Sequence, residues 1–297
     1  MLYQSKLNNR VIDNFKDVRY LLLLPALLIL GTVGGYFIVN CSGGGYCEFY
    51  AGVQKDLFIN LNEWLSRSPH LQNNLTQLGD VLIFFPLVSV FVIYAPKLWE
   101  ALLASAIFSL IAASTLKKLF AVPRPAAMFD NDSFVIIGKA LKGSTSLPSG
   151  HSIATFVVIS ILLFAFMPKK SIQKTLWMLF ILTFGLFIAI SRVGVGAHYP
   201  LDVVVGSTIG FIVTVLGVKV CNKRNWLSCL SNKKYRPVLI LILLGWSGAI
   251  ISKIVDKNLP IFYLSLLALI VTLCLILKSY VWKKSEAKLF RVNTQSC

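Results

Sequence analysis

Long apolar runs separated by short polar or basic segments dominate the pattern of this chain. An apolar run of about 20 residues is long enough to cross the hydrocarbon core of a bilayer as a helix. Eight runs reach or approach that length, at 20–39, 81–96, 99–118, 151–168, 175–191, 199–219, 237–253 and 259–281. The pattern predicts an all-α polytopic membrane helix bundle, in which the second, fifth and seventh spans are short and have soft limits.

The first apolar run follows a basic segment, as the apolar core of a signal peptide does. However, the run stays apolar for about twenty residues and lacks the small-residue cleavage pattern of a signal peptide. We therefore expect residues 20–39 to form a retained membrane anchor.

Composition and charge support the membrane interpretation and exclude a nucleic-acid partner. The 297 residues are 56% hydrophobic and 14% charged, whereas soluble domains are about 25% charged. If the N-terminus is cytoplasmic and all eight spans cross, 19 of the 29 Lys and Arg residues fall on cytoplasmic segments. This is the positive-inside bias of membrane proteins, and it accounts for the net charge of +17. The basic segments would contact anionic membrane lipids, and both termini would lie in the cytoplasm.

The cysteines leave one question open. Cys41 and Cys47 flank "SGGGY" in the first external loop, where a disulfide could form on an oxidising face. Spacing alone does not decide between a bridge and two thiols. Cys221 and Cys229 fall on the cytoplasmic side without the context of a metal finger.

Four span ends that carry polar residues are predicted to meet at the outer membrane face. The third span ends in "STLKKLFAVPRP", the fourth begins with "LPSGHS", and the fifth and sixth join within "SRVGVGAHYPLD". A single cation at a span end is explained by snorkelling to the interface. Here two histidines, a carboxylate and three cations converge, which indicates a functional site. The residues brought together are Lys117, Arg124, Ser149, Gly150, His151, Arg192, His198 and Asp202.

His198 and Asp202 have the spacing of an activated histidine nucleophile. Four residues apart, they share one face of the first turn of a helix. A carboxylate that accepts from one ring nitrogen fixes the tautomer and leaves the other nitrogen with a free lone pair. His198, His151 and Asp202 are the predicted catalytic residues, with His198 as nucleophile and His151 as the acid that protonates the leaving oxygen.

The remaining residues suit the binding of phosphate. Arginine presents a planar fork to phosphate oxygens, and lysine acts as a point charge. The turn "PSGHS" adds a hydroxyl, a glycine that permits close backbone approach, and the N-terminus of a helix. The predicted phosphate-binding residues are Lys117, Arg124, Ser149, Gly150 and Arg192. Asp130 and Asp132 are better explained as a solvated loop than as metal ligands, so we expect neither a metal nor another cofactor.

Three motifs together resemble one known family. Lys117, Arg124 and Pro125 fit K-x6-R-P, residues 148–151 fit P-S-G-H, and residues 191–202 fit S-R-x5-H-x3-D. In order and spacing they are similar to the type 2 phosphatidic acid phosphatase superfamily, over residues of about 80–220. The resemblance implies a six-helix phosphatase core, metal-independent hydrolysis and the roles given above. We expect a lipid phosphatase domain at 1–236, followed at 237–297 by an additional transmembrane helix pair and a basic tail for which the motifs suggest no function.

The resulting hypothesis is a lipid phosphate phosphatase at the periplasmic face of a bacterial inner membrane, with no obligate protein partner. Its substrate could be phosphatidylglycerophosphate, undecaprenyl diphosphate, phosphatidate or lipid A. One alternative is a phosphotransferase that passes the phosphoryl group to another lipid. A second is a non-catalytic transporter that uses the same cations to bind an anion.

Two further external segments have open interpretations. Residues 51–66 place Val53, Leu57, Leu61, Trp64 and Leu65 at helical spacing, which fits either an interfacial helix or a helix that caps the bundle. The apolar "FVII" within 126–146 could contact acyl chains, although packing on the protein is the simpler interpretation. His70, in a polar loop, is expected to be solvated.

Overall fold

A computed structural model describes residues 6–40, 45–223 and 235–293, with side chains up to residue 278. Its described part is built from helices and contains no strand, which confirms the all-α prediction. The helices are α1 (Lys6–Lys16), η2 (Tyr20–Leu22), α2 (Leu23–Asn40), α3 (Tyr46–Val53), α4 (Lys55–Ser66), α5 (Pro69–Leu78), α6 (Val81–Leu87), α7 (Phe91–Tyr94), α8 (Pro96–Phe120), α9 (Pro125–Met128), η3 (Asn131–Ser133), α10 (Gly150–Ala165), α11 (Ser171–Gly194), α12 (Pro200–Lys223), α14 (Arg236–Lys257) and α15 (Pro260–Asn293). Cys41 and Cys229 lie outside the described residues, so whether Cys41 and Cys47 form a disulfide stays open.

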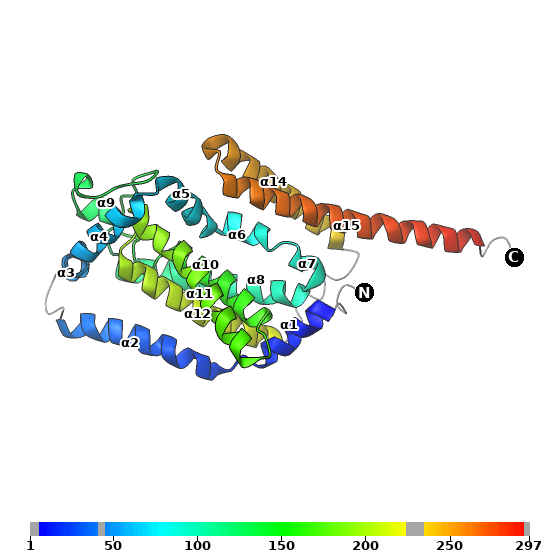
Figure 1. The fold of residues 1–297 in the computed structure, drawn as a ribbon, viewed down its shortest axis with the longest axis horizontal. Coiled ribbons are helices and arrows are strands. Elements are labelled where there is room, and N and C mark those ends of the chain that lie inside the picture. Colours follow the sequence, from blue (N-terminus) through cyan, green and yellow to red (C-terminus); the bar gives the residue numbers. More distant parts are fainter. Residues whose placement is uncertain (1–5, 41–44, 224–234, 294–297) are drawn as a thin grey trace.

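The long helices lie side by side and run between two ends of the molecule (Figure 1). One end, called the site end below, carries α3, α4, α9 and the segment 129–149, and the opposite end carries α1. Within the described residues, six helices are long and apolar enough to cross a membrane, and α10 is a shorter apolar helix of 16 residues. The protein is therefore an integral membrane protein.

The predicted span at 81–96 forms two short helices separated by a turn rather than one continuous helix. Helix α6 ends at Leu87, one residue after Pro86, and a turn leads into the short α7. Proline has no backbone N–H to donate and its ring clashes with the preceding turn, so the helix cannot continue regularly. Helices α5, α6 and α7 together carry the chain from the site end to the opposite end (Figure 1).

Side chains from the C-terminal helices bond to this broken segment. Trp246 of α14 donates to the carbonyl of Leu82 at 2.9 Å, and Ser265 of α15 donates to the carbonyl of Ile83 at 2.9 Å. Irregular backbone at membrane depth is tolerated where protein groups satisfy it. The pair α14–α15 packs on α5 and α6, and thereby supports the one crossing that is not a continuous helix.

Helix α12 lies at the centre of the bundle, where glycines let its neighbours approach closely. A Cβ atom placed on Gly210 would lie 2.5 Å from the carbonyl oxygen of Ile153 in α10. One placed on Gly217 would lie 2.2 Å from Ser105 Oγ in α8. Small residues at such crossings permit the tight backbone packing on which membrane helices depend. Helices α8 and α10, which carry Lys117 and His151, are thus in direct contact with α12.

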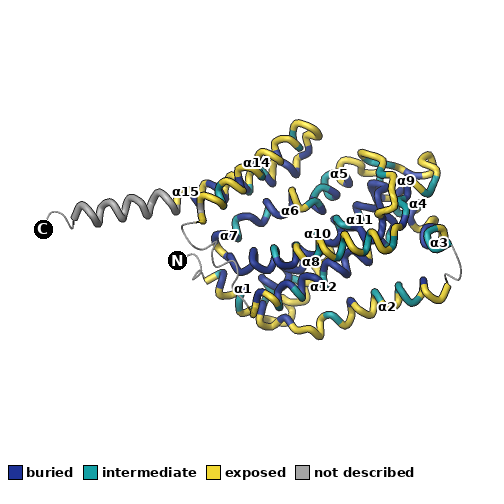
Figure 2. Tube along the Cα trace, turned by 180° about the vertical axis from the view of Figure 1, so that it is seen from behind, coloured by how far each residue is buried: buried dark blue, intermediate teal, exposed yellow. Residues whose placement is uncertain are grey.

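The two N-terminal helices differ in how they pack. Helix α1 lies across the opposite end, where Asn14 Nδ2 donates to the carbonyls of Ala165 at 2.9 Å and Met167 at 3.1 Å. These bonds satisfy carbonyls at the C-terminal end of α10. Helix α2, in contrast, is largely exposed along its length and stands at the edge of the bundle (Figure 2).

Candidate active site

The centre of the site is a buried pair where the loop after α11 enters α12. His198 Nδ1 lies 3.2 Å from Asp202 Oδ2, and the two side chains are 1% and 0% exposed. His198 belongs to the loop that joins α11 to α12, and its backbone N–H donates to the carbonyl of Arg192 at 3.2 Å. In the same loop Gly196 has a φ of +73°, a conformation that glycine adopts without strain. The loop therefore turns tightly enough to bring Arg192 and His198 together.

Asp202 is held by three donors besides the imidazole. The Tyr50 hydroxyl donates to Oδ1 at 2.7 Å, and the Tyr199 backbone N–H donates to Oδ2 at 2.9 Å. The Ser146 hydroxyl also donates to Oδ2. A buried carboxylate needs such partners, because an unpaired charge away from water is costly. Tyr50 and Ser146 come from α3 and from the segment before α10, so three parts of the chain fix one carboxylate.

Arg124 identifies the tautomer of His198. Its Nη1 lies 3.2 Å from His198 Nε2 and 3.0 Å from the carbonyl oxygen of Ala197. Because a guanidinium can only donate, Nε2 must accept and Nδ1 must carry the ring proton toward Asp202. The lone pair that would attack a substrate therefore faces a cation in the substrate-free protein.

The electrostatic surroundings of His198 favour its neutral form. Burial is the largest cause that holds the pKa of this imidazole well below its usual value of 6.5. The charges of Arg192, Arg124 and Lys117 lower the pKa further. A neutral ring keeps the lone pair of Nε2 available at neutral pH.

Arg192 is a buried cation that is only partly satisfied by the protein. Its side chain is 6% exposed, and Nη1 donates to the hydroxyl of Thr76 in α5. Its Nε is buried and has no hydrogen-bond partner. A buried donor without an acceptor is unfavourable, so an anion bound here would supply the missing partner.

The N-terminus of α10 adds further groups that suit an anion. Ser149 is the N-cap of this helix, and its Oγ accepts from the Ser152 backbone N–H at 3.3 Å. The Ser149 N–H donates to the carbonyl of Asp202 at 3.1 Å, which joins the start of α10 to α12. Lys117 Nζ lies 3.5 Å from the position of a Cβ atom on Gly150, so the ammonium group sits against this turn.

His151 follows on the first turn of α10 and is half-buried. It interacts electrostatically with His198, Arg192, Lys117 and Arg124. A Cβ atom placed on Gly79 would lie 2.9 Å from His151 Cβ, so the turn between α5 and α6 packs directly on this histidine. The structure thus brings all eight predicted site residues to the site end, while His70 is exposed at its surface.

Several residues that complete the site were not identified from the sequence. Asn62 of α4 is fully buried and donates to the carbonyls of Val193 and Gly194 at 3.0 and 3.2 Å. It also exchanges two hydrogen bonds with the backbone of Val135, at 3.0 and 2.8 Å. The only sequence signal was its position between Phe58 and Leu65 on one helical face. Tyr50, Ser146, Thr76 and Gly79 lie 50 or more residues from their partners and gave no local signal.

The external segments cap the bundle. In α4, Phe58 and Leu65 are buried, while Leu57 and Trp64 are 54% and 62% exposed. Phe134, the first residue of "FVII", is buried and packs edge-on against Phe58, with ring centroids 5.1 Å apart. Both segments therefore pack on the protein, and α4 keeps a second apolar face toward the surroundings.

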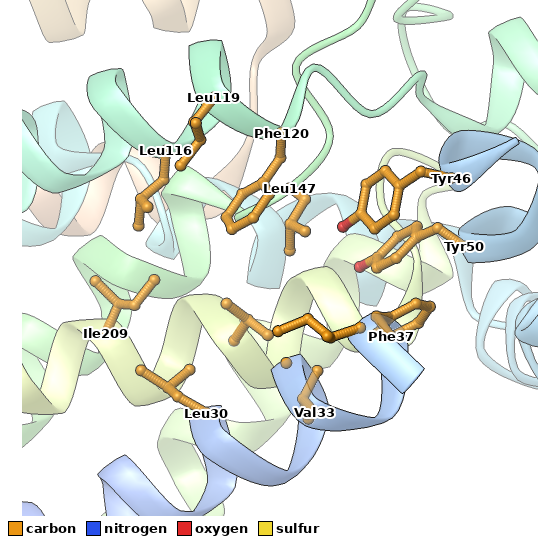
Figure 3. Close-up of a pocket in the computed structure, with 13 residues that line it drawn as sticks. Leu30, Val33, Phe37, Tyr46, Tyr50, Leu116, Leu119, Phe120, Leu147 and Ile209 are labelled. Atoms are coloured by element: carbon orange, nitrogen blue, oxygen red, sulfur yellow. The ribbon is translucent and has the colours of Figure 1, made fainter. Parts of the chain in front are cut away.

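An apolar crevice of about 880 Å³ reaches the site from the side of α2. It lies between α2, α8 and α12, and the rings of Tyr46 and Tyr50 close it at the site end (Figure 3). Tyr50 links the crevice to the site, because its hydroxyl donates to Asp202. The lining residues are Leu30, Val33, Gly34, Phe37, Ile38, Tyr46, Tyr50, Leu116, Leu119, Phe120, Leu147, Val205 and Ile209.

The chain is similar in sequence to several known proteins. The family model of the PAP2 superfamily matches residues 98–226. The chain is 27% identical over 206 residues to undecaprenyl-diphosphatase of Sulfolobus acidocaldarius, which covers 68% of this chain and 90% of that protein. It is 33% identical over 70 residues to phosphatidylglycerophosphatase B of Haemophilus influenzae, or 23% of this chain and 29% of that protein. The crystal structure of Aquifex aeolicus LpxE matches with a TM-score of 0.47 and 24% identity, over 56% of this chain and 95% of that chain.

The matched segment coincides with the site. It begins in α8 and runs past the end of α12, so it contains all three sequence motifs and the eight residues gathered at the site end. The resemblance inferred from those motifs is thereby confirmed. Residues 98–226 of the chain are similar to the PAP2 superfamily.

Proposed function

We propose that the protein hydrolyses a phosphate ester or diphosphate of a membrane lipid through a phosphohistidine on His198. The observation that carries the proposal is the pairing of this ring, with Nδ1 directed at Asp202 and Nε2 accepting from a cation. This is the arrangement of an oriented nucleophile beside the charge that would receive phosphate oxygens. The relatives named above are phosphatases of lipid phosphates, which supports the same class of substrate.

In the first step, Nε2 of His198 attacks phosphorus and the bond to the leaving oxygen breaks. His151 gives its proton to that oxygen, and Asp202 stabilises the positive charge that develops on the attacking ring. In the second step, water attacks the phosphohistidine and returns a proton to His151, and inorganic phosphate leaves. Lys117, Arg124 and Arg192 balance the charge of the equatorial oxygens, with the Ser149 hydroxyl and the start of α10.

The crevice supports a substrate with a long apolar chain. Its lining is almost entirely aliphatic or aromatic, and it ends at Tyr50, which bonds to Asp202. A chain that lies there would leave its polar headgroup at the site end. Undecaprenyl diphosphate, phosphatidylglycerophosphate, phosphatidate and lipid A all combine such chains with a phosphate group.

The charge distribution supports a location in a bacterial inner membrane. The termini and most basic residues would face the cytoplasm, with the site end at the periplasmic face. Because three cations already surround the phosphate position, we further propose that hydrolysis needs no metal ion.

The test is release of inorganic phosphate by the purified protein from each candidate lipid, with and without a chelator. The His198→Ala variant is expected to lose activity by about 10⁴-fold or more, as enzymes do on loss of a nucleophile or its base. The His70→Ala variant, in which an exposed histidine is removed, should match the original protein.

Three outcomes would contradict parts of the proposal. Unchanged phosphate release by His198→Ala would exclude a phosphohistidine on this residue. Transfer of the phosphate group to an acceptor lipid, without release of inorganic phosphate, would favour phosphotransfer. Loss of activity with chelator, restored by a divalent cation, would contradict metal independence.

A further inference from the structure

The C-terminal helices α14 and α15 contact the segment that supports the site, although no motif lies in them. The backbone N–H of Ile261 donates to Asn74 Oδ1 at 3.3 Å, which ties the start of α15 to α5. Trp246 and Ser265 bond to carbonyls of α6. The turn between α5 and α6, residues 79–80, therefore lies between the C-terminal pair and the site.

The strongest of these contacts is an ion pair. Lys253 Nζ lies 2.7 Å from Asp80 Oδ2, and the two side chains are 29% and 25% exposed. The other carboxylate oxygen of Asp80 accepts from the Leu82 N–H at 3.0 Å and caps α6. The two oxygens thus have different partners: Oδ1 caps α6, and Oδ2 pairs with Lys253 of α14.

Asp80 lies close enough to the site to matter for its charge. It comes four residues after Thr76, whose hydroxyl accepts from Arg192, and directly after Gly79, which packs on His151. Its carboxylate acts electrostatically on Arg192. Asp80 is therefore a fixed anion whose charge reaches a buried cation, and the Nε of that cation has no partner. An uncompensated carboxylate at this place would compete with phosphate for the charge of Arg192.

We propose that Lys253 is a positioning residue, which compensates Asp80 so that Arg192 stays available to a phosphate group. The inference rests on the proposed role of Arg192 as a phosphate ligand. It gives the C-terminal helix pair a function, since α14 delivers the compensating charge to the site from outside the matched family segment. The effect is on binding of the anion, and the chemical step itself does not involve Lys253.

The test uses orthovanadate as a phosphate mimic, with its dissociation constant measured by calorimetry on the purified protein and its inhibition constant measured on phosphate release. Lys253→Met is expected to weaken vanadate binding about two- to fivefold, the size that pairs with partial solvent exposure support. KM should rise with little change in kcat. Lys257→Met removes the same charge from an exposed position one turn further along α14, and should change neither constant.

The decisive variants remove the carboxylate charge. Asp80→Asn keeps an oxygen that can cap α6, and should bind vanadate at least as tightly as the original protein. Asp80→Asn combined with Lys253→Met should recover the affinity that Lys253→Met loses, although the ion pair is still absent. A double variant as weak as Lys253→Met would show that the pair is merely structural and overturn the inference, as would a weaker Asp80→Asn alone.

The calorimetric measurement separates this inference from the proposed function. If the original protein binds vanadate but releases no phosphate from any lipid, the proposed function fails while the dependence on Lys253 is still measured. If Lys253→Met does not fold, Asp80→Asn alone decides, because its expected affinity does not require the ion pair. Equal vanadate affinity of Lys253→Met and Lys257→Met would contradict the inference directly.

Discussion

At the scale of single residues, the proposed nucleophile is held in one orientation before a substrate binds. Nδ1 of His198 is directed at a carboxylate that three further donors immobilise, and Nε2 accepts from Arg124. An arriving phosphate offers Arg124 a stronger, charged acceptor than a neutral ring nitrogen. Substrate would therefore draw the guanidinium away and free the lone pair at the moment when it is needed.

The pH dependence of activity is expected to reflect this environment. The attacking ring must be neutral, and burial together with Arg192, Arg124 and Lys117 lowers the pKa of His198 well below 6.5. Activity that depends on neutral His198 is present above the lowered pKa and lost below it. The acidic limb of kcat/KM, which reports the free enzyme, should therefore have its midpoint below pH 6.5.

The pH profile of kcat/KM should be measured with two substrates whose phosphate groups ionise at different pH. A midpoint shared by both substrates reports ionisation of the enzyme, whereas a midpoint that differs between them reports ionisation of the substrate. A limb that stays at or above pH 6.5 with both substrates would contradict the expected shift.

The sequence identified the residues proposed to bind phosphate better than those that hold them in place. Lys117, His151 and His198 lie in short motifs at span ends, and the alternation of spans is enough to gather them. Asn62 and Thr76 bond to partners that are more than a hundred residues away, so no local pattern marks them. Their positions depend on how α4 and α5 dock, which hydrophobic periodicity does not specify.

At the scale of elements, helix packing around α12 sets the distances within the site. Helix α10 brings Ser149 and His151, and it meets α12 where Gly206 and Gly210 face it. A Cβ atom on Gly206 would lie 2.7 Å from the carbonyl oxygen of Ser149, so the glycine lies directly beneath the start of α10. The crossing at 81–96 was harder to predict, because an apolar run does not show that Pro86 divides it.

We expect Gly210→Val to push α10 away from α12. The added side chain meets a backbone carbonyl at 2.5 Å, and overpacking of this kind costs about 1–3 kcal/mol. The unfolding temperature in detergent and the rate of phosphate release should both fall. Gly248→Val is the matched control, since a Cβ atom there meets nothing within 4 Å in α14. Equal behaviour of the two variants would show that the close approach is unimportant.

At the scale of the whole molecule, the segment that matches the family model is followed by two C-terminal helices that lie outside it. Helices α8, α10, α11 and α12 carry the matched region, and α14–α15 pack on α5 and α6 beside it. Because successive helices cross in opposite directions, α3, α4 and α9 lie at one end of the molecule and α1 at the other (Figure 1). The proposed orientation, with the site end at the periplasmic face, follows from the positions of the basic residues.

Labelling with a membrane-impermeant maleimide would test this orientation. In a background without the native cysteines, Asp132→Cys at the exposed site end should react in intact cells. Lys170→Cys, exposed at the opposite end between α10 and α11, should react only after the membrane is permeabilised. The reverse pattern would place the site in the cytoplasm.

The crevice beside α2 also bears on how a lipid would reach the site. Ile38 and Leu119 line it and are 82% and 71% exposed, so its mouth opens on the surface that faces the bilayer. A lipid would enter by lateral diffusion within its leaflet, without passing through water. The rate of encounter would then follow the mole fraction of substrate in the membrane surface, and diluting the substrate with inert lipid would slow the enzyme even at constant bulk concentration.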